Sequence, residues 1–249
     1  MSKNSFLGML THRVGVFVFT AGKVIRFGFF LAFLYFLLIR TNTLAGYTLQ
    51  QTIFFFLTFN LIDVIAQFFF REVYRFRPLV VSGSFDLVLL KPMSALFRSL
   101  MGGADILDFF TIPPLIFAVF YVGSQMSPSQ VQVLFYILLV LNGLLIATAF
   151  HIAVLSLGIM TLEIDHTVMI YRSLTNLGRL PIDIYQQPLK GFLTYLVPVG
   201  IMISLPAKAL MGLVSASGVF WSFSLGIIMF TLSLRFWKLA LRKYSSASS

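Results

Sequence analysis

The chain has 249 residues, of which 59% are hydrophobic and only 10% are charged, and it contains 29 phenylalanines and no cysteine. A mean hydropathy of +0.95 excludes a soluble domain and predicts an all-helical integral membrane protein, in which about six spans of roughly 20 residues fit with little left over. The net charge of +10 does not indicate nucleic-acid binding, because the basic residues flank apolar segments instead of forming a soluble basic face.

The first predicted elements are a surface helix and two spans. Residues 5–24 mix apolar side chains with His12 and Arg13, which is typical of a helix that lies in the membrane interface. The apolar segments 25–40 and 49–70 each predict a transmembrane helix. The chain is therefore expected to enter the membrane after an N-terminal interface helix.

Two polar residues lie within the second predicted span. Asn60 and Asp63 are three positions apart and share one face of a helix. An ionisable side chain inside a membrane helix is a candidate for a transport pathway. In the alternative interpretation, Asp63 lies near the lipid headgroups or pairs with an arginine of a neighbouring helix.

The segment RFRPLVVSGSFDLVLLKP follows the second span and carries arginines, a Gly-Ser turn and an aspartate among its apolar residues. Its apolar core is too short to cross a bilayer, and a proline stands near each end. Ser82 or Ser84 can cap a short helix that has Asp86 in its first turn. Residues 77–92 therefore predict a short amphipathic helix that either moves two spans when a partner presses on it or merely lies on the membrane.

The third and fourth spans are predicted at 105–123 and 131–160. Pro113 and Pro114 predict a kink in the third span. The fourth apolar run is longer than one perpendicular crossing requires, so we expect it to tilt or to protrude from the membrane. His151 within it is interpreted as a hydrogen-bonded contact between helices and not as a proton carrier.

The region after the fourth span has two interpretations. Hydropathy selects 192–213 as the fifth span and 217–236 as the sixth. The former segment contains Pro198 and Pro206, however, and such a broken helix is also typical of a re-entrant hairpin. In that second interpretation, the comparatively polar segment 163–180 is the fifth span. Both interpretations keep six spans.

Basic residues are distributed asymmetrically between the predicted loops. They gather at the N-terminus, after the second span and at the C-terminus, whereas the connections 41–47 and 122–130 carry no charge. This pattern predicts that both termini and the segment 77–92 lie in the cytoplasm. Anionic lipid headgroups are the expected partner of most of these cations.

No motif for catalysis or nucleotide binding is visible. The sequence has no G-x-x-x-x-G-K-[ST] phosphate loop, no G-x-S-x-G elbow, no H-E-x-x-H and no paired cysteines, so no catalytic, cofactor-binding or metal-binding residue is predicted. An ion-coupled secondary transporter would need a coupling-ion site, for which only Asp63 and His151 qualify. A membrane-embedded transferase would need acids and histidines that converge at one depth, and none converge.

Two stretches resemble motifs of the type-2 ABC exporter permease family. GSFDLVLLKP, followed by ALFRSL, resembles the family motif R-G-s-f-D-x-l-L-l-r-P after the second span. GRLPIDIYQQPLKGFLTYLVPVGIMISLPAKALMG is similar to the family stretch G-r-x-P-i-d-i-y-P and its proline-containing tail. Gln187-Pro188 departs from the Tyr-Pro that is usual there. With the six-span layout, the resemblance covers nearly the whole chain.

The resemblance implies the membrane-spanning permease subunit of an ATP-binding cassette transporter in the bacterial cytoplasmic membrane. Such a chain pairs with a second permease chain, identical or different, and with separate ABC ATPase subunits that hold ATP and Mg²⁺. Its expected cargo is apolar or amphipathic, because aromatic and aliphatic surfaces dominate. The family pattern also favours a re-entrant hairpin at 181–213 that closes the outer membrane face.

The resemblance implies roles for individual residues as well. The contact with the ATPase is assigned to the interface helix and to the helix between the second and third spans, at His12, Arg13, Arg77, Pro78, Gly83, Ser84, Phe85, Asp86, Leu90, Lys91 and Pro92. Together with the polar residues of the second span, the candidates for the pathway or gate are Asn60, Asp63, Pro181, Asp183, Pro198 and Pro206.

Overall fold

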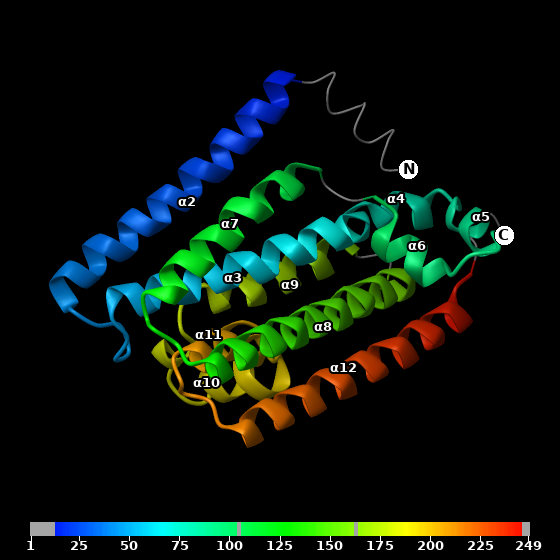
Figure 1. Ribbon diagram of the computed structural model, residues 1–249. Helices are drawn as coiled ribbons and strands as arrows, with labels where there is room; N and C mark the ends of the chain where they lie inside the picture. The colour runs from blue at the N-terminus through cyan, green and yellow to red at the C-terminus, as the bar shows by residue number, and fades with distance from the viewer. Residues whose placement is uncertain (1–12, 104–105, 162–163, 246–249) are drawn as a thin grey trace.

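A computed structural model of the protein describes residues 13–103, 106–161 and 164–245 (Figure 1). Within these ranges every regular element is helical, apart from an isolated bridge between Leu44 and Tyr47. Four of the described helices are long and apolar enough to cross a membrane, and a bent helix pair adds a fifth crossing if it counts as one span. An all-helical, polytopic membrane protein is therefore confirmed, whereas the predicted count of six spans is not reached in this part of the chain.

The helices are labelled in chain order in Figure 1. The long ones are α2 (Arg13–Thr41), α3 (Leu49–Phe70), α7 (Ile106–Ser124), α8 (Gln130–Thr161), α9 (Ile164–Asn176) and α12 (Ala216–Lys243). The short ones are η1 (Arg71–Arg75), α4 (Phe76–Val81), α5 (Phe85–Leu89), α6 (Ala95–Met101), η2 (Leu177–Arg179), η3 (Ile182–Ile184), α10 (Leu189–Gly191), η4 (Phe192–Leu196), η5 (Gly200–Ser204) and α11 (Leu205–Leu210).

The N-terminal helix is continuous over its described length. Sequence analysis separates an interface helix at 5–24 from a span at 25–40, whereas α2 runs through this boundary without a break. α2 contains no proline, so nothing interrupts its backbone hydrogen bonds. It diverges from the other helices toward its N-terminal end (Figure 1), while Leu34 and Leu38 nearer its other end are buried.

The predicted span at 163–180 is occupied by a shorter helix, α9, and the turn η2. α9 has 13 residues, and a helix of that length covers about 20 Å at 1.5 Å per residue, short of a hydrocarbon core of roughly 30 Å. It also carries Asp165, His166 and Arg172. α9 is therefore too short and too polar to cross the membrane as a helix by itself.

Residues 181–213 form a bent structure that packs against α8. The helical segments Leu189–Leu196 and Gly200–Leu210 meet at 77°, which fits either a broken span or a re-entrant loop. A Cβ atom at Gly143 of α8 would lie 2.4 Å from the carbonyl oxygen of Met202. This glycine therefore allows the backbone of η5 to approach α8 closely.

α3 and α8 lie at the centre of the bundle. Phe54, Phe55 and Phe59 of α3 are at most 2% exposed. α8 packs along α12 (Figure 1), and the Asn142 side-chain amide donates hydrogen bonds to the carbonyl oxygen and hydroxyl of Ser222 at 3.0 and 2.8 Å. Buried aromatic packing and this interhelical polar contact hold the long helices together.

The two ends of the bundle carry different short elements (Figure 1). The α5 end consists of residues 71–101 and the C-terminal residues 237–245 of α12 and its cap. The hairpin end consists of the connection 42–48 and the segment 181–213. These two ends contain most of the residues that sequence analysis singles out.

Candidate functional site

A glycine turn starts α5. Gly83 has φ +71°, which glycine adopts without steric cost, and it separates α4 from α5. Ser84 occupies the N-cap position of α5, but its side chain makes no hydrogen bond to the helix backbone. Instead, Ser82 Oγ donates a hydrogen bond to Ser84 Oγ at 2.8 Å. Of the two predicted caps, Ser84 therefore does not cap the helix, whereas Ser82 Oγ accepts a hydrogen bond from the backbone N–H of Ser84, the N-cap residue, at 3.4 Å.

Phe85 anchors α5 to the bundle. Its side chain is 0% exposed, and its ring centroid lies 5.1 Å from that of Phe76, 5.3 Å from that of Tyr244 and 6.4 Å from that of Trp237. All three contacts are edge to face, which is a favoured arrangement of aromatic rings. Phe85 thus attaches α5 to α4 and to the end of α12, and it does not lie on the surface.

A hydrogen bond also joins α5 to the C-terminal cap of α12. The hydroxyl of Tyr244 donates to Asp86 Oδ1 at 2.9 Å. Partial burial, followed by the hydrogen bond and the negative charge of Asp86, raises the pKa of Tyr244 to about 12. The hydroxyl therefore keeps its proton at neutral pH and remains the donor.

The opposite side of α5 is apolar and exposed. The side chains of Leu87 and Leu90 are 62% and 81% exposed, and Lys91 and Pro92 follow them on the surface. We name these four residues the α5 surface. No other part of the described chain covers these leucine side chains, so they are available for contact with a partner or with the membrane surface.

The remaining residues assigned to the ATPase contact are not all gathered there. Arg77 and Pro78 are exposed on α4, and Arg77 Nε lies 3.5 Å from Asp165 Oδ2 of α9. Arg13 begins α2, whose N-terminal end is far from α5 (Figure 1), and His12 lies outside the described residues. The fold thus brings the α4 and α5 residues together and leaves Arg13 apart.

A cavity of about 740 Å³ lies between α2, α3, α7 and the segment formed by α9 and η2. Asn60 and Asp63 both line it from α3. The Asn60 amide donates to the carbonyl oxygen of Phe56 at 2.7 Å, and Asp63 Oδ2 accepts from Gln67 Nε2 at 2.6 Å. Both polar side chains therefore line the same cavity and are hydrogen-bonded within their own helix.

The wall of this cavity combines phenylalanine rings with charged side chains. Phe27 and Phe30 of α2 pack against Phe56 of α3, with ring centroids 5.1 and 4.4 Å away. Lys23 of α2 forms an ion pair with Asp108 of α7. The other basic residues in the wall are Arg26, Arg172 and Arg179.

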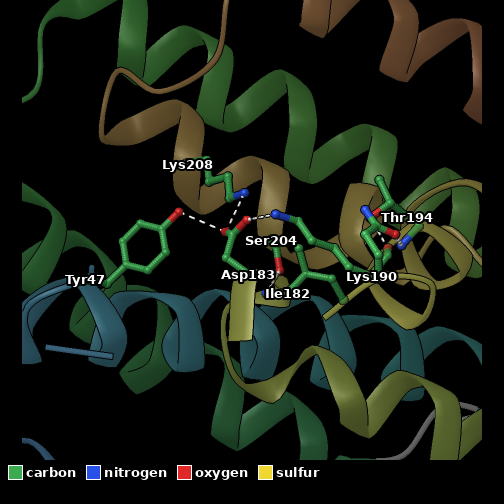
Figure 2. A network of polar contacts seen from close by, with 9 residues as sticks. Tyr47, Ile182, Asp183, Lys190, Thr194, Ser204 and Lys208 are labelled. Carbon is green, nitrogen blue, oxygen red and sulfur yellow. Dashed lines mark hydrogen bonds and ion pairs between the residues drawn. The ribbon is translucent and has the colours of Figure 1, made fainter. Parts of the chain in front are cut away.

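Asp183 is the centre of a polar network at the hairpin end (Figure 2). Its Oδ1 atom lies 2.8 Å from Lys190 Nζ, and its Oδ2 atom lies 2.6 Å from Lys208 Nζ. The hydroxyl of Tyr47, in the connection between α2 and α3, donates to Oδ2 at 2.9 Å. One carboxylate thus connects three separate segments of the chain.

These contacts determine the protonation of the network. Burial alone would raise the pKa of Asp183, but the lysine ammonium groups and the Tyr47 hydroxyl outweigh burial and lower it to about 2. Burial, followed by the hydrogen bond and the charge of Asp183, raises the pKa of Tyr47. At neutral pH the carboxylate is therefore charged and the tyrosine hydroxyl is its donor.

The three prolines assigned to a gate are all buried in the hairpin segment. Pro181 precedes η3, Pro198 lies at the bend between η4 and η5, and Pro206 lies in the first turn of α11. The backbone N–H of Ile182 donates to Ser204 Oγ at 3.3 Å, which connects η3 to η5. The prolines therefore shape the hairpin and do not line the larger cavity.

His151 is buried in α8 and 1% exposed. Its Nδ1 atom donates to the carbonyl oxygen of Ala147 in the same helix at 2.7 Å, and its ring centroid lies 4.9 Å from Phe70 and 4.8 Å from Tyr171. The contact that it makes with other helices is aromatic, so the predicted hydrogen bond between helices is replaced by one within α8. Among the described residues, no group of three His, Asp or Glu side chains could hold a metal ion.

Sequence analysis missed several partners in these sites. Tyr47 and Asp183 are 136 positions apart, and Lys23 and Asp108 are 85 positions apart. In the sequence, ionisable side chains at the edges of apolar segments indicate which residues could form polar contacts, but they do not indicate which residues pair with each other. Pairing required the folded arrangement of the helices.

Comparison with known proteins gives one family. The model of the ABC-2 family transporter protein matches residues 24–248, which is nearly the whole chain. Neither the curated proteins nor the solved structures give a significant match. The match includes α5, the hairpin segment and every residue of the cavity wall except Thr20 and Lys23.

Proposed function

Since the chain belongs to the ABC-2 family of transporter proteins, we propose that it is the permease subunit of an ATP-driven exporter. The four or five apolar helices that could span a membrane support this role. In this proposal separate ATPase subunits bind ATP and Mg²⁺, and a second permease chain, identical or different, completes the pathway. The complex resides in the bacterial cytoplasmic membrane with both termini of this chain in the cytoplasm.

The observation that carries the proposal is the α5 surface. Leu87 and Leu90 are exposed although Phe85 in the same short helix is fully buried. A partner that pushes on a helix needs an exposed contact on one side and a firm anchor on the other, and α5 has both. An ATPase subunit that docks on Leu87 and Leu90 therefore fits this element.

The contacts of α5 supply a route for the transmission of force. Phe85 and Asp86 connect α5 to Trp237 and Tyr244 at the end of α12. Phe85 also packs on Phe76 of α4, which continues through η1 into α3. Movement of the ATPase is therefore expected to displace α12 and α3 together, and not α3 alone.

The cavity and the hairpin complete the proposed mechanism. The cavity beside Asn60 and Asp63 is the cargo site, because it has a volume of about 740 Å³ and α3 shares it with α2 and α7. The hairpin segment, held by Asp183, is the outer closure. Displacement of α3 would change the cavity wall and the position of α3 relative to the hairpin, so one movement would open a path.

The test is reconstitution with the ATPase that co-purifies with the wild-type chain. We expect the double substitution Leu87→Ser and Leu90→Ser to abolish co-purification and the stimulation of ATP hydrolysis by the permease. Leu213→Ser is the matched control, because Leu213 is a leucine of similar exposure, 59%, at the hairpin end. This control should retain both properties.

Two results would overturn the proposal. Undiminished ATPase association in the double variant would exclude α5 as the docking site. Solute movement by the purified chain alone, driven by a proton or sodium gradient across a vesicle membrane, would instead identify an ion-coupled secondary transporter.

A further inference from the structure

The cavity between α2, α3, α7 and α9 carries more positive than negative charge. Four basic residues and two acidic residues line it. Lys23 and Asp108 form an ion pair, which leaves three guanidinium groups and the single carboxylate of Asp63. The cavity is therefore cationic whether Asp63 is charged or protonated.

Two of these guanidinium groups form no close ion pair with a carboxylate among the described residues, although Arg172 interacts electrostatically with Asp63 at longer range. Arg172 contacts Gln67 Oε1 at 3.5 Å and lies 5.6 Å from the ring centroid of Tyr74. Arg179 lies 5.6 Å from the ring centroid of Phe59, and its buried Nε atom has no hydrogen-bond partner. Because no ion pair in the described part of the chain neutralises these two guanidinium groups, an anionic group in the cavity would be stabilised by their charge.

The rest of the wall is predominantly apolar. Phe27, Phe30, Phe56 and Phe59 contribute aromatic rings from α2 and α3, and α7 contributes Pro114 together with further apolar residues. A volume of about 740 Å³ is within the range of sites that hold drug-sized organic molecules. The wall thus offers an apolar surface and several planar cationic groups to the same occupant.

We propose that the cavity binds an amphipathic organic anion, with its phosphate or carboxylate group among the basic residues of the wall and an apolar body along the phenylalanines. Guanidinium groups bind both kinds of anion through paired hydrogen bonds. An amphipathic cation would meet like charge, and a wholly apolar molecule would leave the excess positive charge of the wall without a counterion. Identification of this ligand as the transported cargo rests on the proposed function. Binding of the ligand to the cavity does not depend on that function.

The experiment measures binding of radiolabelled dodecyl phosphate to the purified chain in dodecyl maltoside. Dodecyl maltoside is uncharged and has the same alkyl tail as dodecyl phosphate, so it competes for the apolar part of the cavity but not for the basic residues. We expect saturable binding, with dissociation constants raised roughly tenfold or more by Arg172→Gln and by Arg179→Gln, because each removes a charge-assisted hydrogen bond. Unlabelled dodecyltrimethylammonium, which is cationic, should not compete.

Arg235→Gln is the matched control, since it removes the same charge from an exposed position on α12 outside the cavity. It should bind like the wild type. Arg172→Lys should retain part of the affinity because it keeps the charge. Unfolding temperatures measured without dodecyl phosphate identify any variant that has lost its fold. If a variant is unfolded, the inference is tested on the wild type alone, by comparing competition from the anionic and the cationic probe.

Two sources of such an anion are distinguished by a second arm. In nanodiscs of neutral phosphatidylcholine, competition by added phosphatidylglycerol would identify a membrane lipid, and competition by dodecyl phosphate alone would identify a free amphiphile. Unchanged binding in both glutamine variants, or equal competition by the cationic probe, would overturn the inference. Undiminished ATPase association in the variant with both Leu87→Ser and Leu90→Ser, together with intact binding of dodecyl phosphate, would overturn only the proposed function, so the two failures are distinguishable.

Discussion

The α5 end and the hairpin end hold their short helices by different interactions. At the α5 end, the ring of Phe85 lies among three aromatic rings, and the leucines on the other side of α5 are exposed. At the hairpin end, Asp183 joins Tyr47, Lys190 and Lys208 in a network whose polar groups satisfy one another (Figure 2).

This difference indicates different roles. The α5 end buries one apolar side and exposes another, which is the arrangement that the proposed docking of an ATPase subunit requires. The hairpin end uses directional contacts between segments that are far apart in the chain, and such contacts have a defined geometry that is either made or broken. We infer that the α5 end receives force and that the hairpin end holds one conformation of the bundle.

Substitution of Phe85 tests the anchor at the α5 end and has the largest expected effect. Phe85→Ala should lower the free energy of unfolding by about 3–5 kcal/mol, because it removes a fully buried ring and leaves a cavity. The control is Phe97→Ala in α6, since Phe97 is 57% exposed at the same end. It should change stability by less than about 0.5 kcal/mol. Unfolding in detergent, followed by tryptophan fluorescence, measures both, and similar losses would contradict an anchor at Phe85.

Removal of the Asp183 carboxylate tests the hairpin network. Asp183→Ala should cost about 3 kcal/mol, because Lys190, Lys208 and Tyr47 all lose their acceptor and hydrogen bonds to charged groups are stronger than neutral ones. Asp165→Ala is the matched control.

Asp165 pairs with Arg77 on the surface, where the two side chains are 67% and 52% exposed. Exposed pairs of this kind contribute about 0–1 kcal/mol. Thermal unfolding of both variants in the same detergent measures the difference, and a loss at Asp165 as large as that at Asp183 would show that the network adds nothing beyond a surface ion pair.

The extent to which the sequence predicts this structure follows from the range of the interactions. The segment 49–70 has the bounds of α3, because a long apolar run without proline forms a helix by local hydrogen bonding and burial. α2 and α12 extend beyond the predicted spans, since a helix continues past the apolar run until a residue or cap stops it. α12 thus includes the basic segment up to Lys243, beyond the predicted end at residue 236.

The sites depend on contacts that no local pattern specifies. The spacing of Asn60 and Asp63 predicts a shared helix face, but the arginines opposite come from α9 and η2. Phe85 belongs to a recognisable motif, yet its burial depends on Trp237 and Tyr244 more than 150 positions away. Family motifs therefore identify important segments, whereas the role of each side chain requires the fold.

Two tyrosines give a matched comparison of the ends. Tyr244 and Tyr47 each donate one hydrogen bond to a carboxylate, at 2.9 Å in both cases. Tyr244→Phe and Tyr47→Phe should each reduce stability by about 1 kcal/mol, because the ring is kept and one hydrogen bond is lost. Only Tyr244→Phe should also weaken the stimulation of the ATPase, since it loosens α5 from α12. Equal effects of both variants on ATPase activity would contradict the assignment of different roles to the two ends.

The pH dependence of unfolding gives the smallest and most specific test of the hairpin network. The folded-state pKa of Asp183 is lowered to about 2, below the value of about 3.9 for an unfolded aspartate. Between these two values the unfolded chain binds more protons, so the contribution of Asp183 to stability is present above about pH 4 and is lost as the pH falls toward 2. The thermal unfolding midpoint of the wild type should therefore decrease more between pH 5 and pH 3 than that of Asp183→Asn. The two proteins share all other carboxylates, so the effects of those groups cancel when the two profiles are compared. Parallel pH profiles for the two proteins would show that Asp183 is not held as a carboxylate by its lysines.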